Sequence, residues 1–554
     1  RHPRRSGRRE APDVPTAAGS VRMSPPVDVK PVVAIVDPIS TGASLAKFLS
    51  DRGYPLVRVF SDTLPDEVKA LVAEGLEVDW RVTIQHEGPG RAAYTAAALR
   101  GVGVTHVIVG SEPGVSLHAE LTSYFADSPV PAEKIELRRN KYLQSEAVRD
   151  AGIDAVHQTL AHSREDVEEF IRTIERSGAA AFKAVVKPVE GAGSDGVSIC
   201  NSAEEARAAF GRLEGAGSDG VSICNSAEEA RAAFGRLEGT KNILGLANYA
   251  VLCQEFLAGD EYVVDSVSRG GEHKVVALWR YDKRDYYGSP VVYHGMQLLN
   301  VESDASLLSA MVGYVTSVLD ALGVTDGAMH TEVMSTPRGP VLVEVNCRLH
   351  GGEGIWLPIA KACLRYTQVS ALHDATFAPD AFAALPPTPL CPMHQHGAWV
   401  TLRSPSDGTV TAIHHERLAQ IRALPSFLGE YFAPCISVGS RVRQTVDATT
   451  VHGCFNLAHA ERSVLEEDYA VAQQLVNDGL FSVAPPKPDE EGVVRVETPS
   501  GMKVSYSFSD GEVLQNSLWG SRGRLAQMWK PVDGAMNKPV PVARLREVRR
   551  SWRF

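Results

Sequence analysis

The most constraining feature of this sequence lies in its C-terminal half, where two short apolar runs flank the segment Ser335-Thr-Pro-Arg-Gly-Pro340. Apolar runs on either side of such a turn predict a β-hairpin, with its tip near Arg338. Pairing that is symmetric about the tip gives three opposed pairs: Glu332 with Glu344, His330 with Asn346, and Met334 with Leu342. The carboxylates of Glu332 and Glu344 then share one face of the hairpin.

Alternation along the second strand of this hairpin separates polar from apolar side chains. We expect one face to carry Leu342, Glu344, Asn346 and Arg348, and the core-facing side to carry Val341, Val343 and Val345. Like charges directly across a sheet repel, so two opposed carboxylates beside a carboxamide and an arginine favour a bound cation and a bound anion. Magnesium on a polyphosphate supplies both. The alternative is an exposed hairpin whose charges face water.

The composition is that of a large soluble protein. The chain has 554 residues, of which 44% are hydrophobic and 22% charged, enough for several domains. A net charge of −11 and a pI near 5.9 argue against a general nucleic-acid or membrane-surface binder, and no apolar run is long enough to span a bilayer. We therefore expect no nucleic-acid partner, no membrane association and a cytoplasmic location. Residues 1–30, rich in Arg and Pro, are expected to form a disordered leader.

The first compact unit alternates strands and helices. Buried strands are predicted over 32–36, 56–60 and 105–109, with helices over 43–52 and from 115 towards Tyr124. This order predicts a parallel sheet covered by helices on both faces. Ligands of such sheets bind beyond the carboxyl ends of the strands, where Ser40, Thr41 and Glu112 fall. For Glu112 alone, a solvated loop acid is the competing interpretation.

A glycine-rich loop follows a helix predicted over 141–150, a strand over 155–160 and an amphipathic helix over 164–177. Gly191, Gly193 and Gly196 match G-x-G-x-x-G, but the strand 197–200 follows where a dinucleotide-binding fold requires a helix. A strand, a glycine loop and a second strand instead predict a flap that lays backbone N–H groups over phosphates. Lys187, on the strand before the flap, is placed to contact an α- or β-phosphate.

The flap lies in a tandem duplication. Residues 191–214 recur letter for letter as residues 215–238, too few copies for a solenoid. Only the first copy follows the strand that carries Lys187. We therefore expect the first copy to be functional and the second to be surplus, at the domain edge or poorly ordered. An error in the gene sequence is the alternative.

Two strands predicted over 249–257 and 261–267 flank a turn at 258–260. Backbone groups near Phe256 and Leu257 can hydrogen-bond an adenine edge, and Glu261 can accept from ribose hydroxyls. A plain hairpin without a ligand is the alternative.

Taken together, these motifs resemble the ATP-grasp superfamily, whose motif order they follow: Lys141, Lys187-Pro-x-x-Gly-x-Gly-Ser-x-Gly196, Gln254-Glu-Phe-Leu-x-Gly-x-Glu261, and Glu332 through Glu344-Val-Asn-x-Arg348. The segments 36–42, 110–115 and 348–352 are similar to the branch containing bacterial L-amino acid ligases, the bacilysin-type dipeptide synthetases. The resemblance covers about residues 32–479. The duplicated flap and the residues from Pro485 onward have no counterpart in that family.

The resemblance implies an α/β fold with α+β lobes. The expected units are the leader 1–30, an N-terminal Rossmann-like parallel-sheet domain 31–135, an ATP-grasp small lobe 136–256, a large lobe with the metal site 257–375, a C-terminal lobe 376–484 and a β-prone basic tail 485–554.

It also implies roles for individual residues. The ATP-binding set is Lys141, Lys187, Gly191, Gly193, Ser194, Gly196, Gln254, Glu255, Phe256, Leu257 and Glu261. Mg²⁺, with Mn²⁺ as a substitute, is expected on Glu332, Glu344 and Asn346. Arg348 and Lys187 are the expected catalytic residues, and Glu112, Arg348 and His330 are the expected substrate contacts.

The activity implied is ATP-dependent ligation of a carboxylate to an amine through an acyl phosphate, with amino acids or other small amines as partners and a homodimer as one option. A ligase for a ribosylamine or a non-amino carboxylate, and a nucleotide-binding module without catalysis, are the alternatives. Further pocket candidates are the run 279–287, which reads equally well as an exposed strand and loop, and Trp356.

Overall fold

The computed structural model describes residues 30–485, apart from 67, 70–76, 177–182, 190–197, 201, 204–206, 208–249, 301–304, 390, 433–435 and 449, together with 493–497 and 503–507. The predictions for Gly191, Gly193, Ser194 and Gly196 and for the second copy, 215–238, lie outside the described residues. Within the described part of the chain, no helix has the length and apolar character needed to cross a membrane.

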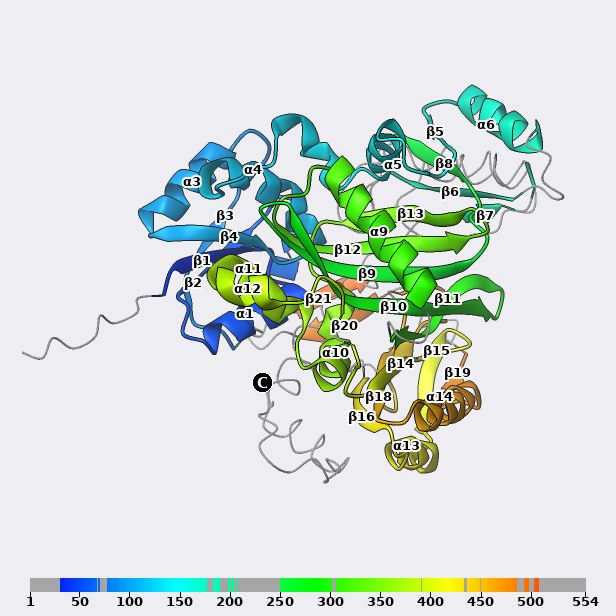
Figure 1. Ribbon diagram of the computed structural model, residues 1–554. Coiled ribbons are helices and arrows are strands. Elements are labelled where there is room, and N and C mark those ends of the chain that lie inside the picture. The colour runs from blue at the N-terminus through cyan, green and yellow to red at the C-terminus, as the bar shows by residue number, and fades with distance from the viewer. Residues whose placement is uncertain are drawn as a thin grey trace, which may run out of the picture.

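The N-terminal domain is the predicted parallel sheet, on the left of Figure 1. Its strands are β1 (Val32–Val36), β2 (Leu56–Phe60), β3 (Trp80–Gln85) and β4 (Val104–Val109), in the order β3-β2-β1-β4. Helix α1 (Thr41–Ser50) packs on the face of Val33 and Ile35, while α3 (Ala92–Gly101) and α4 (Val115–Phe125) pack on the face of Ala34 and Val36. Burial on both faces explains why β1 is apolar at every position.

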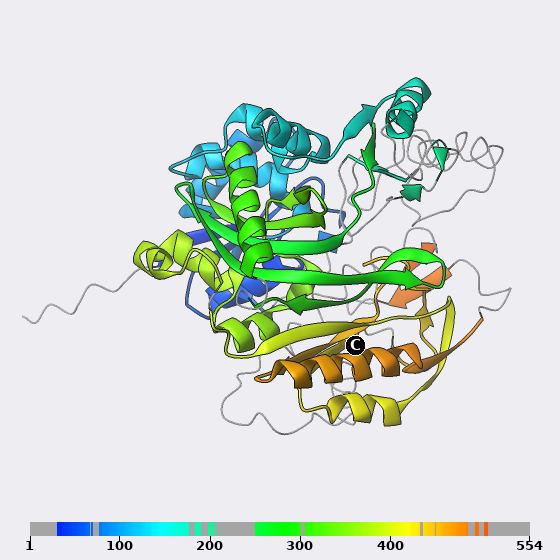
Figure 2. The same cartoon turned by 45° about the vertical axis from the view of Figure 1, so that its right-hand side comes forward.

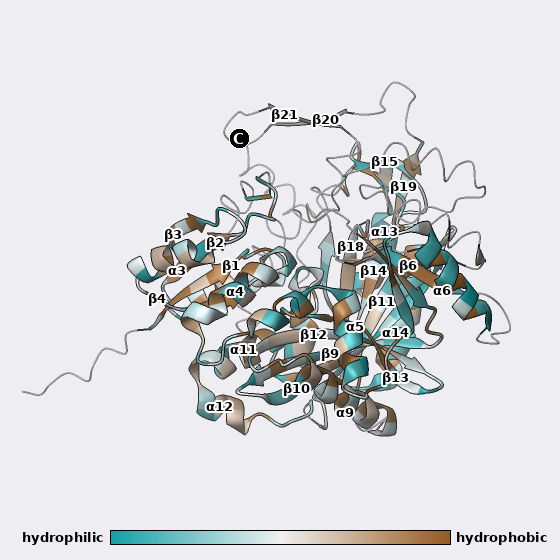
Figure 3. Ribbon diagram, turned by 90° about the horizontal axis from the view of Figure 1, so that it is seen from above, coloured by the Kyte–Doolittle hydropathy of each residue, from teal (hydrophilic) through white to brown (hydrophobic). Residues whose placement is uncertain are grey.

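The small lobe is an antiparallel sheet of β5 (Gln158–Ala161), β6 (Ala184–Pro188), β7 (Ser198–Cys200) and β8 (Val251–Glu255), in the order β5-β8-β6-β7. Helix α6 (Arg164–Arg176) buries Val167, Phe170, Ile171 and Ile174 against it, a helical spacing that Figure 3 displays as alternating hydrophilic and hydrophobic colours. The strand predicted from Ala155 begins only at Gln158, because Ala155 packs into the core of the large lobe instead.

A large antiparallel sheet forms the centre of the molecule (Figures 1 and 2). In spatial order its strands are β13 (Gly339–Asn346), β12 (Gly327–Thr336), β9 (Asp260–Arg269), β10 (Glu272–Tyr286), β11 (Ser289–Leu298), β14 (His396–Leu402), β18 (Gly453–His459) and β16 (Phe427–Phe432). Helix α9 (Ala305–Ala321) covers one face, and α10 (Leu357–Leu364), α11 (Gln368–Phe377) and α12 (Pro379–Ala384) lie on the other side, in the core shared with α1. Residues 279–286 of the run 279–287 belong to the long strand β10, and Tyr287 lies in the turn that follows.

Strands from both the proposed large lobe and the proposed C-terminal lobe join this one sheet, which therefore continues across the predicted boundary at 375/376. Beyond it lie α13 (His415–Arg422), α14 (Arg462–Asn477) and a three-stranded sheet of β15 (Gly408–Ile413), β17 (Arg441–Val442) and β19 (Phe481–Ala484). In the tail, β20 (Val493–Glu497) pairs with β21 (Lys503–Ser507).

The hairpin of β12 and β13 has most of the predicted register. Glu332 lies opposite Glu344 and His330 opposite Asn346, as expected. The pairing of Met334 with Leu342 is wrong, because Met334 faces Val341. The turn closes on Pro337 and Arg338 alone, between Thr336 and Gly339, and an irregularity at Val343 restores the register further along.

The same irregularity changes which side chains of β13 face the core. Leu342 and Val345 both pack under α9, whereas Val343 is only partly buried. The prediction that Leu342 shares the polar face and that Val343 faces the core is therefore wrong. Alternation predicts side-chain faces only as far as the nearest bulge.

Candidate active site

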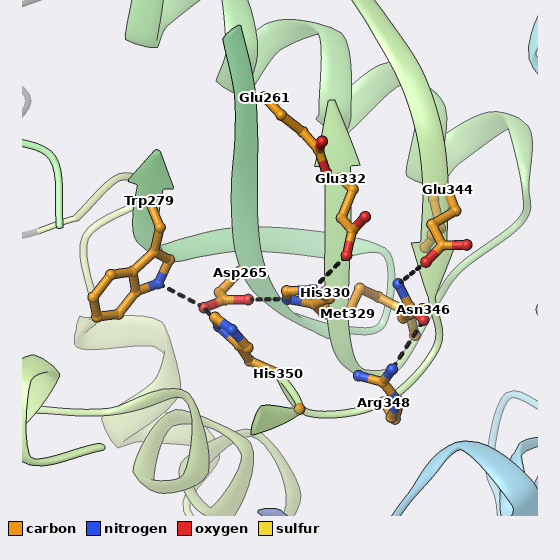
Figure 4. A network of polar contacts seen from close by, with 12 residues as sticks. Glu261, Asp265, Trp279, Met329, His330, Glu332, Glu344, Asn346, Arg348 and His350 are labelled. Carbon is orange, nitrogen blue, oxygen red and sulfur yellow. Dashed lines mark hydrogen bonds and ion pairs between the residues drawn. The ribbon is translucent and has the colours of Figure 1, made fainter. Parts of the chain in front are cut away.

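Three carboxylates converge on one face of the large sheet (Figure 4). Glu332 and Glu344 lie opposite each other on β12 and β13, and Glu261 on β9 lies beside Glu332. Their side chains are 14%, 13% and 15% exposed, respectively. Burial raises the pKa of Glu261, and the neighbouring Glu332 adds to this against the opposing effect of Lys283. Crowded, poorly solvated acids of this kind are a site for a cation.

Cations from both lobes surround these acids. Lys141, at the start of α5 (Lys141–Asp150), places its Nζ 2.9 Å from Glu344 Oε2, and Lys283 on β10 contacts both oxygens of Glu261 at 2.7 Å. Lys187 on β6 is buried. Burial and the nearby Lys141 ammonium lower the pKa of Lys187 to about 8, although Glu344 and Glu332 partly oppose the shift. An incoming phosphate would favour the charged form of this lysine.

A helix–strand contact fixes the small lobe against the site. Gln144 on α5 donates through Nε2 to the carbonyl of Val345 at 2.8 Å and accepts the Val345 N–H through Oε1 at 2.9 Å. Val345 lies on β13, the edge strand of the large sheet, so the Gln144 carboxamide extends the hydrogen bonding of the sheet beyond its edge. Because Lys141 begins the same helix, this contact sets its distance from Glu344.

A hydrogen-bonded chain runs from the acids to the N-terminal domain. Asn346 Nδ2 donates to Glu344 Oε1 at 3.0 Å, and Arg348 donates to Asn346 Oδ1 at 3.0 Å and to Glu112 Oε2 at 2.8 Å. Arg139 Nε lies 3.4 Å from the other oxygen of Glu112. Burial alone would raise the pKa of Glu112, but Arg348 and Arg139 outweigh it and lower that pKa. Glu112 is therefore a mostly buried, paired carboxylate, and the solvated-loop interpretation is wrong.

His330 lies behind Glu332. Its Nδ1 is 3.0 Å from Asp265 Oδ1 and its Nε2 is 3.2 Å from Glu332 Oε1. Although burial opposes the charged form, hydrogen bonds to these two carboxylates raise the pKa of His330 to about 9. Both ring nitrogens thus have protein partners, and the substrate contact expected for His330 stays a prediction.

The residues expected around adenine lie at the end of β8. Gln254 is buried and donates to Gln158 Oε1 at 2.9 Å, and the Phe256 ring lies under Lys183 Nζ, 3.8 Å from its centroid. The carboxylate of Glu255 instead binds Arg338 at the hairpin tip, which links the small lobe to β12 and β13. Nucleotide contacts for Gln254, Glu255, Phe256 and Leu257 stay predictions.

Sequence reasoning missed two residues of the site, Arg139 and Asp265, and it named Lys283 only as part of the candidate run 279–287. Lys283 shares the strand phase of Trp279 and Tyr281, and its Nζ lies over the rings of Tyr281 and Tyr293, 4.6 and 4.4 Å from their centroids. The alternation of 279, 281 and 283 was the available signal. Arg139 precedes Lys141 by two positions. Asp265, fully buried on β9, gave no local signal.

Comparisons with known proteins agree with this architecture. A family profile described as ATP-grasp domain matches residues 213–356. Dapdiamide A synthase of Enterobacter agglomerans is 29% identical over 458 residues, which cover 81% of this chain and 96% of that protein.

Two solved structures support the same fold. The L-amino acid ligase from Bacillus licheniformis aligns with a TM-score of 0.58 at 14% identity, covering 83% of this chain and 99% of that one. Carboxyaminoimidazole ribonucleotide synthase from Aspergillus clavatus, solved with ATP, aligns with a TM-score of 0.54 at 12% identity, covering 81% and 99%. From the motifs, the fold and these relatives together, the chain is an ATP-dependent carboxylate–amine ligase that contains an ATP-grasp domain.

Proposed function

We propose that this protein activates the carboxylate of an amino acid as an acyl phosphate and joins it to the amine of a second small molecule, with release of ADP and phosphate. The observation that carries the proposal is the continuous chain from Glu344 through Asn346 and Arg348 to Glu112. It joins side chains of metal-binding type to a mostly buried acid of the N-terminal domain, which supports the proposal that one guanidinium serves both the phosphate and the substrate.

The chemistry requires ATP because a carboxylate is a poor acyl donor, since its leaving group would be oxide. Phosphorylation replaces that leaving group by phosphate. Attack of an uncharged amine on the acyl phosphate then forms the amide bond, expels phosphate and releases a proton. Bringing a carboxylate to a polyphosphate gathers anions, so most of the catalysis must come from opposing charge and from positioning.

The donor set fits Mg²⁺. Glu332, Glu344 and the side-chain oxygen of Asn346 are hard oxygen ligands of the type this ion takes, and the crowding of acids beside them is relieved by a divalent cation. When bound, Mg²⁺ would neutralise phosphate charge as it is transferred. In this proposal Lys141 and Lys187 contact phosphate oxygens, and Lys283 balances the charge of Glu261.

In this proposal Arg348 is the residue that acts at the reacting atoms. Its planar guanidinium already contacts Asn346, Glu112 and the carbonyl of Leu349, which fixes its orientation. We propose that it stabilises the transferred phosphoryl group and the acyl phosphate. Glu112 retains lone pairs beyond its contacts with Arg348 and Arg139, and these can accept from the ammonium of an amino-acid substrate.

Two kinds of observation support amino acids as the substrates. A mostly buried, anionic Glu112 beside Arg348, whose guanidinium can bind a carboxylate, suits a molecule that carries both an ammonium and a carboxylate. The names of two similar proteins, dapdiamide A synthase and an L-amino acid ligase, are consistent with this class.

A panel of amino acids, tested singly and in pairs with Mg·ATP, checks the proposal by phosphate release and by mass spectrometry of the products. We expect single compounds to give little phosphate, and at least one pair to raise the rate and yield the condensed amide. Nucleotide binding without stimulation by any amino-acid pair would contradict the proposal. Stimulation only by a ribosylamine or a non-amino carboxylate would redirect it to another ligase of the superfamily.

A further inference from the structure

Behind the proposed metal site lies a buried carboxylate that the mechanism above does not use. Asp265 has no exposed surface, and each of its oxygens has a partner (Figure 4). Oδ1 accepts from His330 Nδ1 at 3.0 Å, while Oδ2 accepts from His350 Nδ1 at 2.9 Å and from Trp279 Nε1 at 2.8 Å. A buried acid with three donors is held in one orientation and holds its donors in turn.

Asp265, His330 and His350 also have the spacing of a metal site, with one candidate ligand atom each within 4.8 Å of the others. Their hydrogen bonding argues for a different role. An ionised carboxylate can only accept, so the Nδ1 atoms of both histidines must donate to it and have no lone pair for a metal. The cluster is therefore a hydrogen-bond network in which both histidines donate to Asp265.

One branch of the network ends at a proposed metal ligand. His330 lies directly across from Asp265 in the pairing of β9 with β12, and its second nitrogen is 3.2 Å from Glu332 Oε1. The imidazole of His330, which Asp265 fixes, thus holds the carboxylate of Glu332 in place. Groups that fix metal ligands in this way commonly change metal affinity when they are altered.

The other branch ends at the loop that follows Arg348. The His350 ring stacks on Trp356 with centroids 5.1 Å apart and an interplanar angle of 18°. The His350 carbonyl accepts from Thr41 Oγ1 of the N-terminal domain at 2.5 Å, and its N–H donates to Gln368 at 2.8 Å. The position of His350 therefore sets where the loop meets the N-terminal domain, two residues from Arg348.

We propose that Asp265 is a positioning residue that couples the two halves of the active site. Through His330 it orients Glu332 for the cation, and through His350 it orients the loop that presents Arg348 to the carboxylate substrate. The proposal rests on the proposed function, because it takes Glu332 as a metal ligand and Arg348 as a substrate contact. It predicts that the two effects can be separated by changing one branch at a time.

Four variants test the coupling: Asp265→Asn, His330→Phe, His350→Phe and the control Ser266→Ala. Ser266 is buried next to Asp265 on β9, and its hydroxyl has no hydrogen-bond partner in the described part of the chain, so this control perturbs the same strand without entering the network. Electron paramagnetic resonance measures Mn²⁺ binding to the protein with a non-hydrolysable ATP analogue. Steady-state kinetics measures KM for the carboxylate substrate, and thermal unfolding measures stability.

We expect His330→Phe to weaken Mn²⁺ binding by about 10- to 100-fold and to change KM for the carboxylate much less. His350→Phe should raise that KM and leave Mn²⁺ affinity near native, and Asp265→Asn should do both. If Mn²⁺ affinity and KM change together in all three variants, in proportion to the loss of stability, the network is merely structural and the proposal is overturned. Native Mn²⁺ affinity and native KM in the variants would also overturn it. If Asp265→Asn does not fold, the two histidine variants decide the question.

The native protein separates this proposal from the proposed function. If native protein binds no Mn²⁺ in the presence of the nucleotide analogue, the metal site itself is wrong. If native protein binds Mn²⁺ and the histidine variants match it in both constants, only the role of Asp265 fails.

Discussion

Glu344→Gln is expected to reduce amine-dependent phosphate release by at least about 10²- to 10³-fold. The amide removes one negative charge from the proposed magnesium site and leaves the ammonium of Lys141, 2.9 Å away, without its anionic partner. Its shape is unchanged, and the amide oxygen can still accept from Asn346. The fold should therefore persist, which thermal unfolding and circular dichroism will check alongside the phosphate assay.

Glu430→Gln is the matched control. Glu430 is also a partly buried, ion-paired glutamate, with Arg422 at 2.6 and 2.9 Å, but it lies on β16 at the opposite edge of the sheet. This variant should retain native turnover. Loss of the folded state in Glu344→Gln, with Glu430→Gln folded, would assign Glu344 a structural role, and near-native turnover would remove it from the site.

Arg348→Lys should lower kcat by about 10²-fold or more while ATP binding stays close to native. The substitution keeps the charge but loses the planar fork that contacts Asn346, Glu112 and Leu349 together. A lysine cannot span these partners and still present a donor to the phosphoryl group. Single-turnover kinetics separates the chemical step, and calorimetry with an ATP analogue measures nucleotide binding.

Arg422→Lys is the matched control. It makes the same exchange at an arginine that donates to both carboxylate oxygens of Glu430, outside the site, and it should leave kcat unchanged. If Arg348→Lys turned over at the native rate, the guanidinium would have no part in phosphoryl transfer. If only ATP affinity fell, Arg348 would be a nucleotide contact instead.

Local sequence patterns predicted the elements that are regular and buried. The strands Val32–Val36 and Leu56–Phe60 are apolar at nearly every position and bounded by residues that end strands, so both were predicted with their observed ends. The edge strand Trp80–Gln85 was not predicted. Trp80, Val82 and Ile84 alternate with exposed polar residues and are only partly buried against the neighbouring cores, a short signal that was overlooked.

The candidate site likewise contains contacts that the sequence predicts and contacts that it does not. Opposition of Glu332 and Glu344 follows from the turn and from strand periodicity, which act over a few residues. The contacts of Arg348 with Glu112 and of His350 with Asp265 join positions 236 and 85 residues apart. Such contacts depend on how separate elements pack, and no local pattern encodes them. The end of a predicted parallel strand and the resemblance to a known family pointed to Glu112, and nothing pointed to Asp265.

Transfer of oxygen from the carboxylate to phosphate tests the central claim most directly. The carboxylate substrate, labelled with ¹⁸O in its carboxyl group, is turned over with Mg·ATP and the amine, and the released phosphate is analysed by mass spectrometry. An acyl phosphate intermediate predicts one ¹⁸O in each phosphate released and one left in the amide. Amide formation with unlabelled phosphate would contradict activation of the carboxylate by phosphorylation at this site.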